Sequence, residues 1–204
     1  MKRHDPRSRG LRPSRLFLPI LLLLCVAPLA SGEGFHIEVT AHPDYPSVAG
    51  KIAVLPPVAP PGVDPDWLAK LVAGRVSLRA RSTLVGPQES ARAIAAAGLD
   101  VRSDEGRAAL GCELGVESLL EIRVSDVARW RYEEGEPREG TVLKKKRTDR
   151  ARATVRLRIA SADSNRMWFE GETRGTGIGS SEKPLVQEML DRLLERSLPL
   201  RGTR

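Results

Sequence analysis

The protein is a chain of 204 residues with 33 lysines and arginines, 26 aspartates and glutamates, and a net charge of +7. This length fits one domain with tails and excludes a large multidomain protein. Six of the basic residues and one acidic residue lie within residues 1–32. Most of the positive excess therefore belongs to the N-terminus and does not indicate an anionic partner for the rest of the chain.

Residues 1–32 have the three parts of a secretory signal. A basic region ends at Arg15, the apolar run LFLPILLLLCVAPLA follows, and the small residues Ala-Ser-Gly close the segment at Gly32. The apolar run is short and contains Pro19 and Pro28, which argues against a membrane-spanning helix. We predict a signal peptide and an exported protein, periplasmic or attached to the periplasmic face of a membrane, the outer membrane rather than the inner one.

Two cysteines bear on this prediction. A lipoprotein signal places a small residue before the acylated cysteine, whereas Leu24 precedes Cys25. We therefore interpret Cys25 as part of the signal core, with lipidation as the disfavoured alternative. Cleavage near Gly32 would leave Cys112 as the remaining thiol, and its helical, apolar surroundings predict a buried small side chain.

The elements follow in chain order after a flexible leader over residues 33–50 that includes a short strand at Phe35–Thr40. The domain over residues 51–198 is predicted to contain a strand at Lys51–Leu55, helices at Asp64–Ala80, Gln88–Ala97, Ser103–Leu114 and Glu182–Leu198, and further strands at Ser82–Val85, from Ser118, at Thr154–Ala160 and at Met167–Thr176. Residues 199–204 form a tail.

This order predicts an α/β fold with one domain. Strands separated by helices favour parallel pairing in the first half, and consecutive strands favour antiparallel pairing in the second. We expect a mixed, partly parallel sheet flanked by helices in two or three layers, with a late antiparallel hairpin and a C-terminal amphipathic helix.

Three short motifs resemble a family of exported bacterial envelope proteins. Ile52-Ala53-Val54-Leu55-Pro56 matches the opening strand of this family, and Leu114-Gly115 precedes a central strand as it does there. Near the end, the turn Asp163-Ser164-Asn165 lies before Met167-Trp168 at the start of a strand. The family includes the curli secretion-channel lipoprotein, the outer-membrane activators of penicillin-binding proteins and the N-terminal domain of TolB. The resemblance covers residues 50–198 and implies a scaffold or regulator that docks on an envelope component without catalysis.

Two loops are reminiscent of phosphate sites. The loop after the first strand contains Pro56, Pro57, Pro60 and Pro61, each of which lacks the backbone N–H that a phosphate cradle needs. We interpret it as a stiff connector, with a recognition loop as the alternative. The run GTGIG over residues 175–179 lacks a lysine and is interpreted as a flexible connector between a strand and a helix.

No catalytic or metal-binding arrangement is predicted. His36 and His42 lie in the leader with Glu38 and Asp44, at a spacing that matches no known ligand pattern. Glu133 and its neighbour Glu134 fall in a glycine-containing loop with nothing to raise a pKa. We expect no enzymatic activity, no cofactor and no metal.

The strongest charge feature is the basic segment over residues 138–158, interpreted as a charged hairpin tip followed by a strand with an arginine face. Its predicted contact residues are Lys144, Lys145, Lys146, Arg147, Arg150, Arg152, Arg156 and Arg158. These side chains protect a strand edge or form a dock for an acidic protein or an anionic envelope surface. Export excludes nucleic acid as the partner.

The function predicted from the sequence is that of a non-catalytic adaptor, regulator or assembly factor in the cell envelope. Two alternatives stay open: a membrane-associated lipoprotein subunit of a secretion assembly, and a small-ligand-binding protein. A homo-oligomer is compatible with all three.

Overall fold

The structure is a computed structural model. It describes residues 34–43, 45, 50–79, 83–135, 145–164, 166–179 and 181–198, without the side chains of 132–135, 145 and 146. The signal segment, Cys25, Asp44, Lys144 and the tail lie outside these residues. The strands are β1 (Phe35–Ala41), β2 (Ile52–Val54), β3 (Leu84–Val85), β4 (Ser118–Gly135), β5 (Lys145–Ser161) and β6 (Met167–Ile178). The helices are α1 (Pro65–Ser77), α2 (Pro87–Ala97), α3 (Asp104–Leu114) and α4 (Lys183–Ser197).

The six strands form one mixed sheet in the order β1-β6-β5-β4-β2-β3. β2 pairs in parallel with β3 and with β4, and the connections between them pass through α1, α2 and α3. The pairs β4–β5, β5–β6 and β6–β1 are antiparallel. The predicted mixed sheet and its late hairpin are therefore confirmed.

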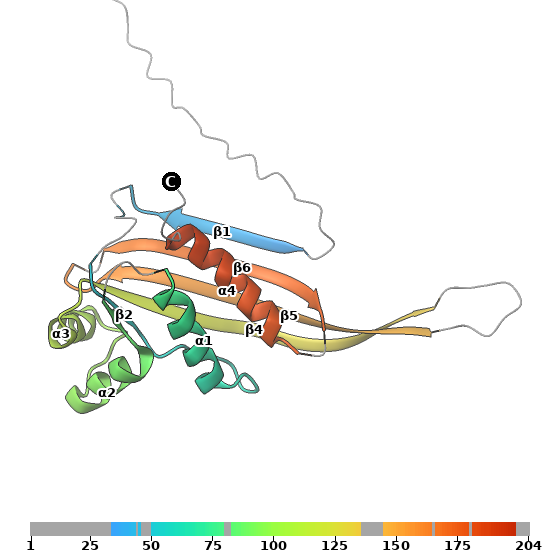
Figure 1. The fold of residues 1–204 in the computed structure, drawn as a ribbon, viewed down its shortest axis with the longest axis horizontal. Helices are drawn as coiled ribbons and strands as arrows, with labels where there is room; N and C mark the ends of the chain where they lie inside the picture. Colours follow the sequence, from blue (N-terminus) through green and yellow to red (C-terminus); the bar gives the residue numbers. More distant parts are fainter. Residues whose placement is uncertain are drawn as a thin grey trace, which may run out of the picture. The chain divides into compact units, whose positions relative to one another are not determined.

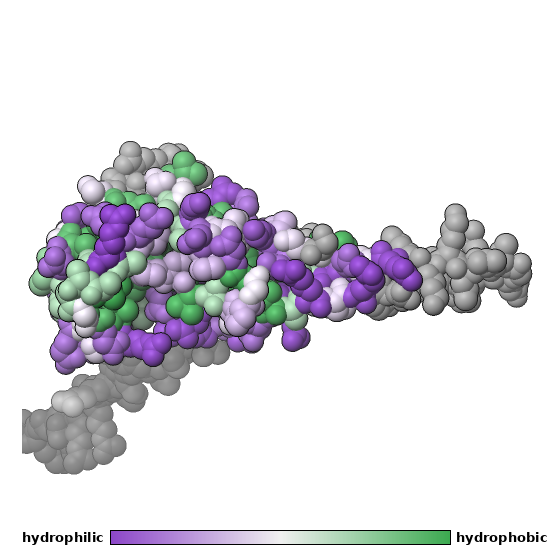
Figure 2. Space-filling view, turned by 90° about the horizontal axis from the view of Figure 1, so that it is seen from below, coloured by the Kyte–Doolittle hydropathy of each residue, from purple (hydrophilic) through white to green (hydrophobic). Residues whose placement is uncertain are grey.

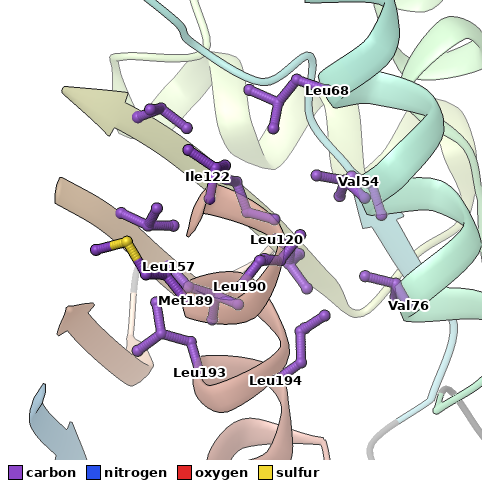
Figure 3. Packing of buried hydrophobic residues seen from close by; sticks show 14 of the residues in the cluster. Val54, Leu68, Val76, Leu120, Ile122, Leu157, Met189, Leu190, Leu193 and Leu194 are labelled. Carbon is purple, nitrogen blue, oxygen red and sulfur yellow. The ribbon is translucent and has the colours of Figure 1, made fainter. Parts of the chain in front are cut away.

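Helices cover the two faces of the sheet unequally (Figure 1). α1 and α4 lie on one face and bury the main core, in which Leu68 of α1 and Leu190 of α4 meet Leu120 and Ile122 of β4 (Figure 3). α2 and α3 lie on the other face, where Leu110 packs with residues of β2, β3 and the start of β4. The fold has three layers at its parallel end, and no described helix packs on the second face of β5, β6 and β1.

The helices begin close to where the sequence predicts, and in α1 and α3 a capping side chain satisfies free backbone N–H groups. The Asp64 carboxylate accepts hydrogen bonds from the N–H groups of Asp66 and Trp67. The Ser103 hydroxyl accepts one from Gly106. Along α4, residues at helical spacing face the core: Leu185, Val186, Met189, Leu190, Leu193 and Leu194 are all buried.

The β4–β5 hairpin is much longer than predicted. The sequence predicts a charged hairpin tip before the strand at Thr154, whereas β4 extends to Gly135 and β5 begins at Lys145, with Trp130 opposite Arg150 and Gly135 opposite Lys145. Its polar residues lack the apolar alternation that predicts a strand, so the pairing is not visible in the sequence. A bulge interrupts β4 between Ser125 and Ala128, where Asp126 has a φ of 53°.

Three further segments differ from expectation or extend it. The strand predicted in the leader is confirmed, includes Ala41, and pairs with β6 along its length. Most of GTGIG belongs to β6, where Gly175 leaves room for Phe35, since a Cβ there would lie 2.6 Å from the Phe35 ring. The prediction for Cys112 is wrong: the residue is exposed, because α3 turns Leu110 and Gly111 toward the sheet instead.

Candidate functional site

The candidate site is the face of β4, β5, β6 and β1 opposite α1 and α4, here called the open face. Side chains alternate along a strand, and Ala151, Ala153 and Val155 are buried beneath α4. The intervening residues of β5 and their neighbours therefore share the open face. Its charged side chains are Glu38, Glu121, Arg123, Arg150, Arg152, Arg156, Arg158, Glu170, Glu172 and Arg174.

Cross-strand ion pairs connect β5 to β6 on this face. The Arg156 Nε donates to Glu172 Oε2 at 2.8 Å, and the Arg158 Nε donates to Glu170 Oε1 at 2.8 Å. Arg174 also donates to Glu172, over 2.7 Å. These distances are those of charge-assisted hydrogen bonds, so two of the predicted contact arginines already have anionic partners.

Glu172 is the centre of this network, held between two guanidinium groups. Burial by itself would raise its pKa, but the hydrogen bonds and charges of Arg156 and Arg174 outweigh this effect and hold the pKa below its ordinary value. In turn, the hydrogen bond and charge of Glu172 raise the pKa of Arg174. The carboxylate is therefore a stable anion at neutral pH.

Glu172→Gln is expected to reduce stability at neutral pH by about 1 kcal/mol and to have little effect in acid. Because folding lowers the pKa of Glu172, its contribution is present above the unfolded value of about 4.3 and is lost as the pH falls through the folded value. Denaturant unfolding at a series of pH values measures this difference. The difference in unfolding free energy between the wild type and Glu172→Gln should therefore shrink in acid. The matched substitution Glu113→Gln, at an exposed site on α3, should show no such pH-dependent difference. A constant difference down to pH 2 would contradict the assignment.

The structure separates the other predicted contact residues. Arg150 and Arg152 are exposed on the open face, whereas Arg147 lies on the opposite side of β5, by strand alternation. Lys145 and Lys146 are strand residues opposite Gly135 and Glu134. The segment is therefore two-sided: Arg150 and Arg152 share the open face with Arg156 and Arg158, and Arg147 lies on the other side.

Residues 130–135 and 145–150, here called the outer hairpin, lie outside the core. None of its described side chains is buried, and Trp130 is 38% exposed. Arg131 and Asp149 pair across the two strands, with Nε 2.8 Å from Oδ1. Figure 2 shows hydrophilic side chains along this part of the molecule. Closer to the core, Arg129 pairs with the buried Glu182 at the start of α4, which connects the base of the hairpin to that helix.

The open face has several shallow hollows, and two of them are larger than the one that Arg156, Glu170 and Glu172 line. The first, of about 550 Å³, is lined by His36, Asp126, Arg152, Thr154 and Arg174 beside the bulge of β4. The second, of about 520 Å³, lies where the open face meets α2 and α3. Its lining includes Leu55, Pro56, Val58, Ile94, Arg102, Arg107, Glu121, Arg123 and Arg158. An apolar base with several guanidinium groups suits a partner that presents an acidic residue beside apolar ones.

The proline loop extends the sheet beside this second hollow. Leu55 N–H donates to Leu120 O at 2.9 Å, Val58 N–H donates to Ile122 O at 3.0 Å, and Val124 N–H returns a bond to Val58 O at 2.8 Å. Pro56 and Pro57 occupy the positions between these bonds, where no donor is used. The loop is thus a connector that covers the edge of β4, and Val58 is 46% exposed within it.

The remaining candidate residues lie on β1, directly after it, and in the outer hairpin. His36 hydrogen-bonds Glu38 at 2.9 Å, and His42 lies edge-on to Trp168. Glu133 and Glu134 are strand residues rather than loop residues. Among the described residues, no cluster of three or more His, Cys, Asp or Glu side chains could hold a metal ion. Nor does that part of the chain include a helix with the length and apolar character needed to cross a membrane.

Sequence reasoning missed Glu170 and Glu172, although a signal for them exists. With a turn at Asp163 and antiparallel pairing, Arg158 falls opposite Glu170, and Arg156 opposite Glu172. Tyr45 was missed as well: its hydroxyl donates to Ser197 O at 3.0 Å, and burial raises its pKa to about 12. It lies in the predicted leader and fastens that segment to the end of α4.

Neither a protein-family model nor a curated protein matches the sequence. Among solved structures, the PelC dodecamer from Paraburkholderia phytofirmans is 13% identical with a TM-score of 0.46, over 82% of this chain and 100% of that one. Lipoprotein GNA1162 from Neisseria meningitidis is 14% identical with a TM-score of 0.47, over 72% and 96%. The LpoB C-terminal domain from Salmonella enterica is 9% identical with a TM-score of 0.38, over 64% and 82%. Each of these is a solved structure to which this chain is similar.

Proposed function

We propose that the protein is exported to the bacterial cell envelope and acts there without catalysis, as an adaptor, regulator or assembly factor. The partner is an envelope protein that contacts the open face and the outer hairpin. Two features of the sequence support export: the signal-like residues 1–32 and the motifs shared with exported envelope proteins. The branch of that family, including any closer relation to the curli secretion-channel lipoprotein, is part of this proposal.

The observation that supports a contact function best is the ribbon that extends from the core. A polar two-stranded hairpin with no described buried side chain contributes nothing to the core, and an isolated hairpin is marginal in stability. Ordering such a ribbon costs conformational entropy, which contact with a partner offsets. The exposed Trp130 and the arginines near it are of the residue types that dominate protein interfaces.

The open face favours a protein partner over a uniformly anionic surface. Glu170 and Glu172 neutralise Arg158 and Arg156, so the face presents alternating charges rather than one positive field. Alternating charges suit a partner with a complementary pattern and fix its orientation. A membrane surface would be bound more strongly by unpaired cations.

The charge reversal Arg150→Glu with Arg152→Glu is expected to reduce partner capture about tenfold while leaving the domain folded. Both side chains are exposed, so the substitution changes the contact surface and not the core. The measurement is in-cell cross-linking of the full chain in its host, followed by quantitative mass spectrometry of the captured envelope proteins. The matched control is Lys70→Glu with Arg92→Glu, which reverses two exposed charges on α1 and α2.

The proposal gains support if one envelope protein is lost from the Arg150/Arg152 variant and retained by the control. Equal capture by both variants would remove the outer hairpin from the proposal. The intact mass of the mature chain tests export separately: a chain that begins near Glu33 in the soluble periplasm fits a diffusible adaptor. A lipid-modified chain that begins at Cys25 would favour the membrane-associated alternative, and an unprocessed cytoplasmic chain would contradict export.

A further inference from the structure

The edge of the sheet at β1 has an open row of backbone hydrogen-bonding groups. Among the described residues, β1 pairs with β6 and has no second neighbour. His42 N–H donates to Trp168 O at 2.8 Å, in register with the β1–β6 pairing. Hydrogen-bonded pairs alternate along an antiparallel ladder, so the backbone groups of His36, Glu38 and Thr40 face β6. Those of Phe35, Ile37, Val39 and Ala41 point outward.

This edge lacks the usual protection against pairing. Natural edge strands are commonly short, or include proline, lysine or a bulge. β1 is seven residues long, with no proline, lysine or arginine, and pairs with β6 without a bulge. The opposite edge differs, since β3 has two residues and Pro87 follows closely. The β3 edge is thus short and followed by a proline, whereas the β1 edge is long and contains no proline.

Apolar side chains along β1 are incompletely covered. Phe35 and Ile37 are partly buried beside α4, and Val39 is 40% exposed. Ile37 also lines a groove of about 640 Å³ that runs beside α4. A strand added next to β1 would cover these side chains and pair the outward backbone groups at once.

We propose that β1 pairs with β1 of a second copy of this chain, antiparallel and around a twofold axis at Ile37. In this register, Ile37 faces Ile37, Phe35 faces Val39, and His36 faces Glu38 of the other copy. The outward backbone groups of the odd-numbered residues meet in hydrogen-bonded pairs, as the ladder requires. His36 and Glu38 occupy the closer, non-hydrogen-bonded positions on the open face, where the imidazole of one copy and the carboxylate of the other are direct neighbours.

Other registers are poorer. A shift that centres the axis on Glu38 places two Glu38 carboxylates opposite each other, and like charges at such positions are destabilising. A shift to Val39 retains the backbone pairing and an overlap of the same length, but it places Glu38 opposite Thr40 and loses the histidine–glutamate contacts. The axis at Ile37 gives a shorter overlap than the axis at Glu38, but it separates the two Glu38 carboxylates and provides two histidine–glutamate contacts. A C2 interface of this kind closes on itself, so it predicts a dimer and not an open fibre.

Cysteine cross-linking tests the register directly. Ile37→Cys, Glu38→Cys and Val39→Cys would be made one at a time in the full chain with Cys112→Ser, and each exported protein oxidised and examined on a non-reducing gel. Ile37→Cys alone should give a covalent dimer, because residues facing each other in a ladder are within disulfide reach, whereas two copies of Val39 would be about four residues out of register. The Cys112→Ser chain without a new cysteine is the background. A dimer from Glu38→Cys or Val39→Cys in place of Ile37→Cys would overturn the register.

A proline substitution tests the interface without removing a bond to β6. Val39→Pro deletes an outward N–H, so the domain should keep its melting temperature within a few degrees while the dimer is lost. Glu38→Lys should weaken the dimer about tenfold, since it places lysine opposite His36. Light scattering with size-exclusion chromatography measures both effects on purified full-length protein. A wild-type chain that stays monomeric, or a Val39→Pro chain that dimerises as the wild type does, would overturn the proposal. The dimer does not depend on the partner proposed above, and either can fail alone.

Discussion

Leu190→Ala should lower the free energy of unfolding by about 3 kcal/mol, because it removes a fully buried side chain from the main core. Leu190 lies on α4, in the same buried cluster as Leu120 and Leu157 (Figure 3). The surrounding strands are paired on both sides and cannot move in to fill the space, so a cavity remains. The expected fall in the melting temperature is about 6–12 °C.

Leu78→Ala is the matched control, since the same atoms are removed where the side chain is 66% exposed. It should change the free energy of unfolding by less than about 0.5 kcal/mol. Denaturant titration of both variants, analysed with the same slope of free energy against denaturant concentration, gives the difference between their free energies of unfolding. A similar loss from both substitutions would show that α4 does not seal the core as described.

The parts of the fold that bury apolar surface were predictable from the sequence. The spacing of Leu68, Val72 and Val76 predicted α1 and its buried face, and the run from Leu185 to Leu194 predicted α4. The alternation from Leu120 to Val124 predicted the inner part of β4 in the same way. In each case, the periodicity reports which side chains leave water, and burial is what stabilises the element.

The parts that do not bury apolar surface were not predictable. The outer hairpin is a strand pair of polar residues, and its pairing depends on a partner strand far along the chain. Cys112 was misplaced because its near neighbours Leu110, Gly111 and Leu114 are apolar or small, which leaves open which side of the helix faces the sheet. The leader strand was visible, but its position at the sheet edge depends on β6.

The candidate site was likewise predictable from the sequence only in part. The sequence identified the arginines of β5 but not their neutralisation, because Glu170 and Glu172 become their neighbours through strand register alone. Register thus converts an apparent basic patch into alternating charges. Of the two partners that the sequence left open, a protein and an anionic envelope surface, this pattern favours the protein. The charge reversal at Arg150 and Arg152 tests this interpretation.

Gly106→Ala is expected to destabilise the protein by about 2 kcal/mol, although alanine is the better helix former. Gly106 is buried in the first turn of α3, where the chain from Asp100 to Ser103 folds closely beneath it. A Cβ there would overlap the Asp100 carbonyl oxygen and lie 2.6 Å from its carbon. That oxygen also accepts the Ser103 hydroxyl at 2.9 Å, so moving it would disturb the cap that starts the helix.

Gly74→Ala provides the opposite expectation for the same substitution. Gly74 is exposed in the middle of α1, and a Cβ there would have no atom within 4 Å. Alanine should stabilise the helix by about 1 kcal/mol, because the unfolded chain loses conformational freedom. Thermal and denaturant unfolding of the two variants should therefore shift in opposite directions. If Gly106→Ala were also stabilising, the Asp100–Ser103 turn would have to move to make room for the added methyl group. The start of α3, beside the second hollow, would then not be rigid.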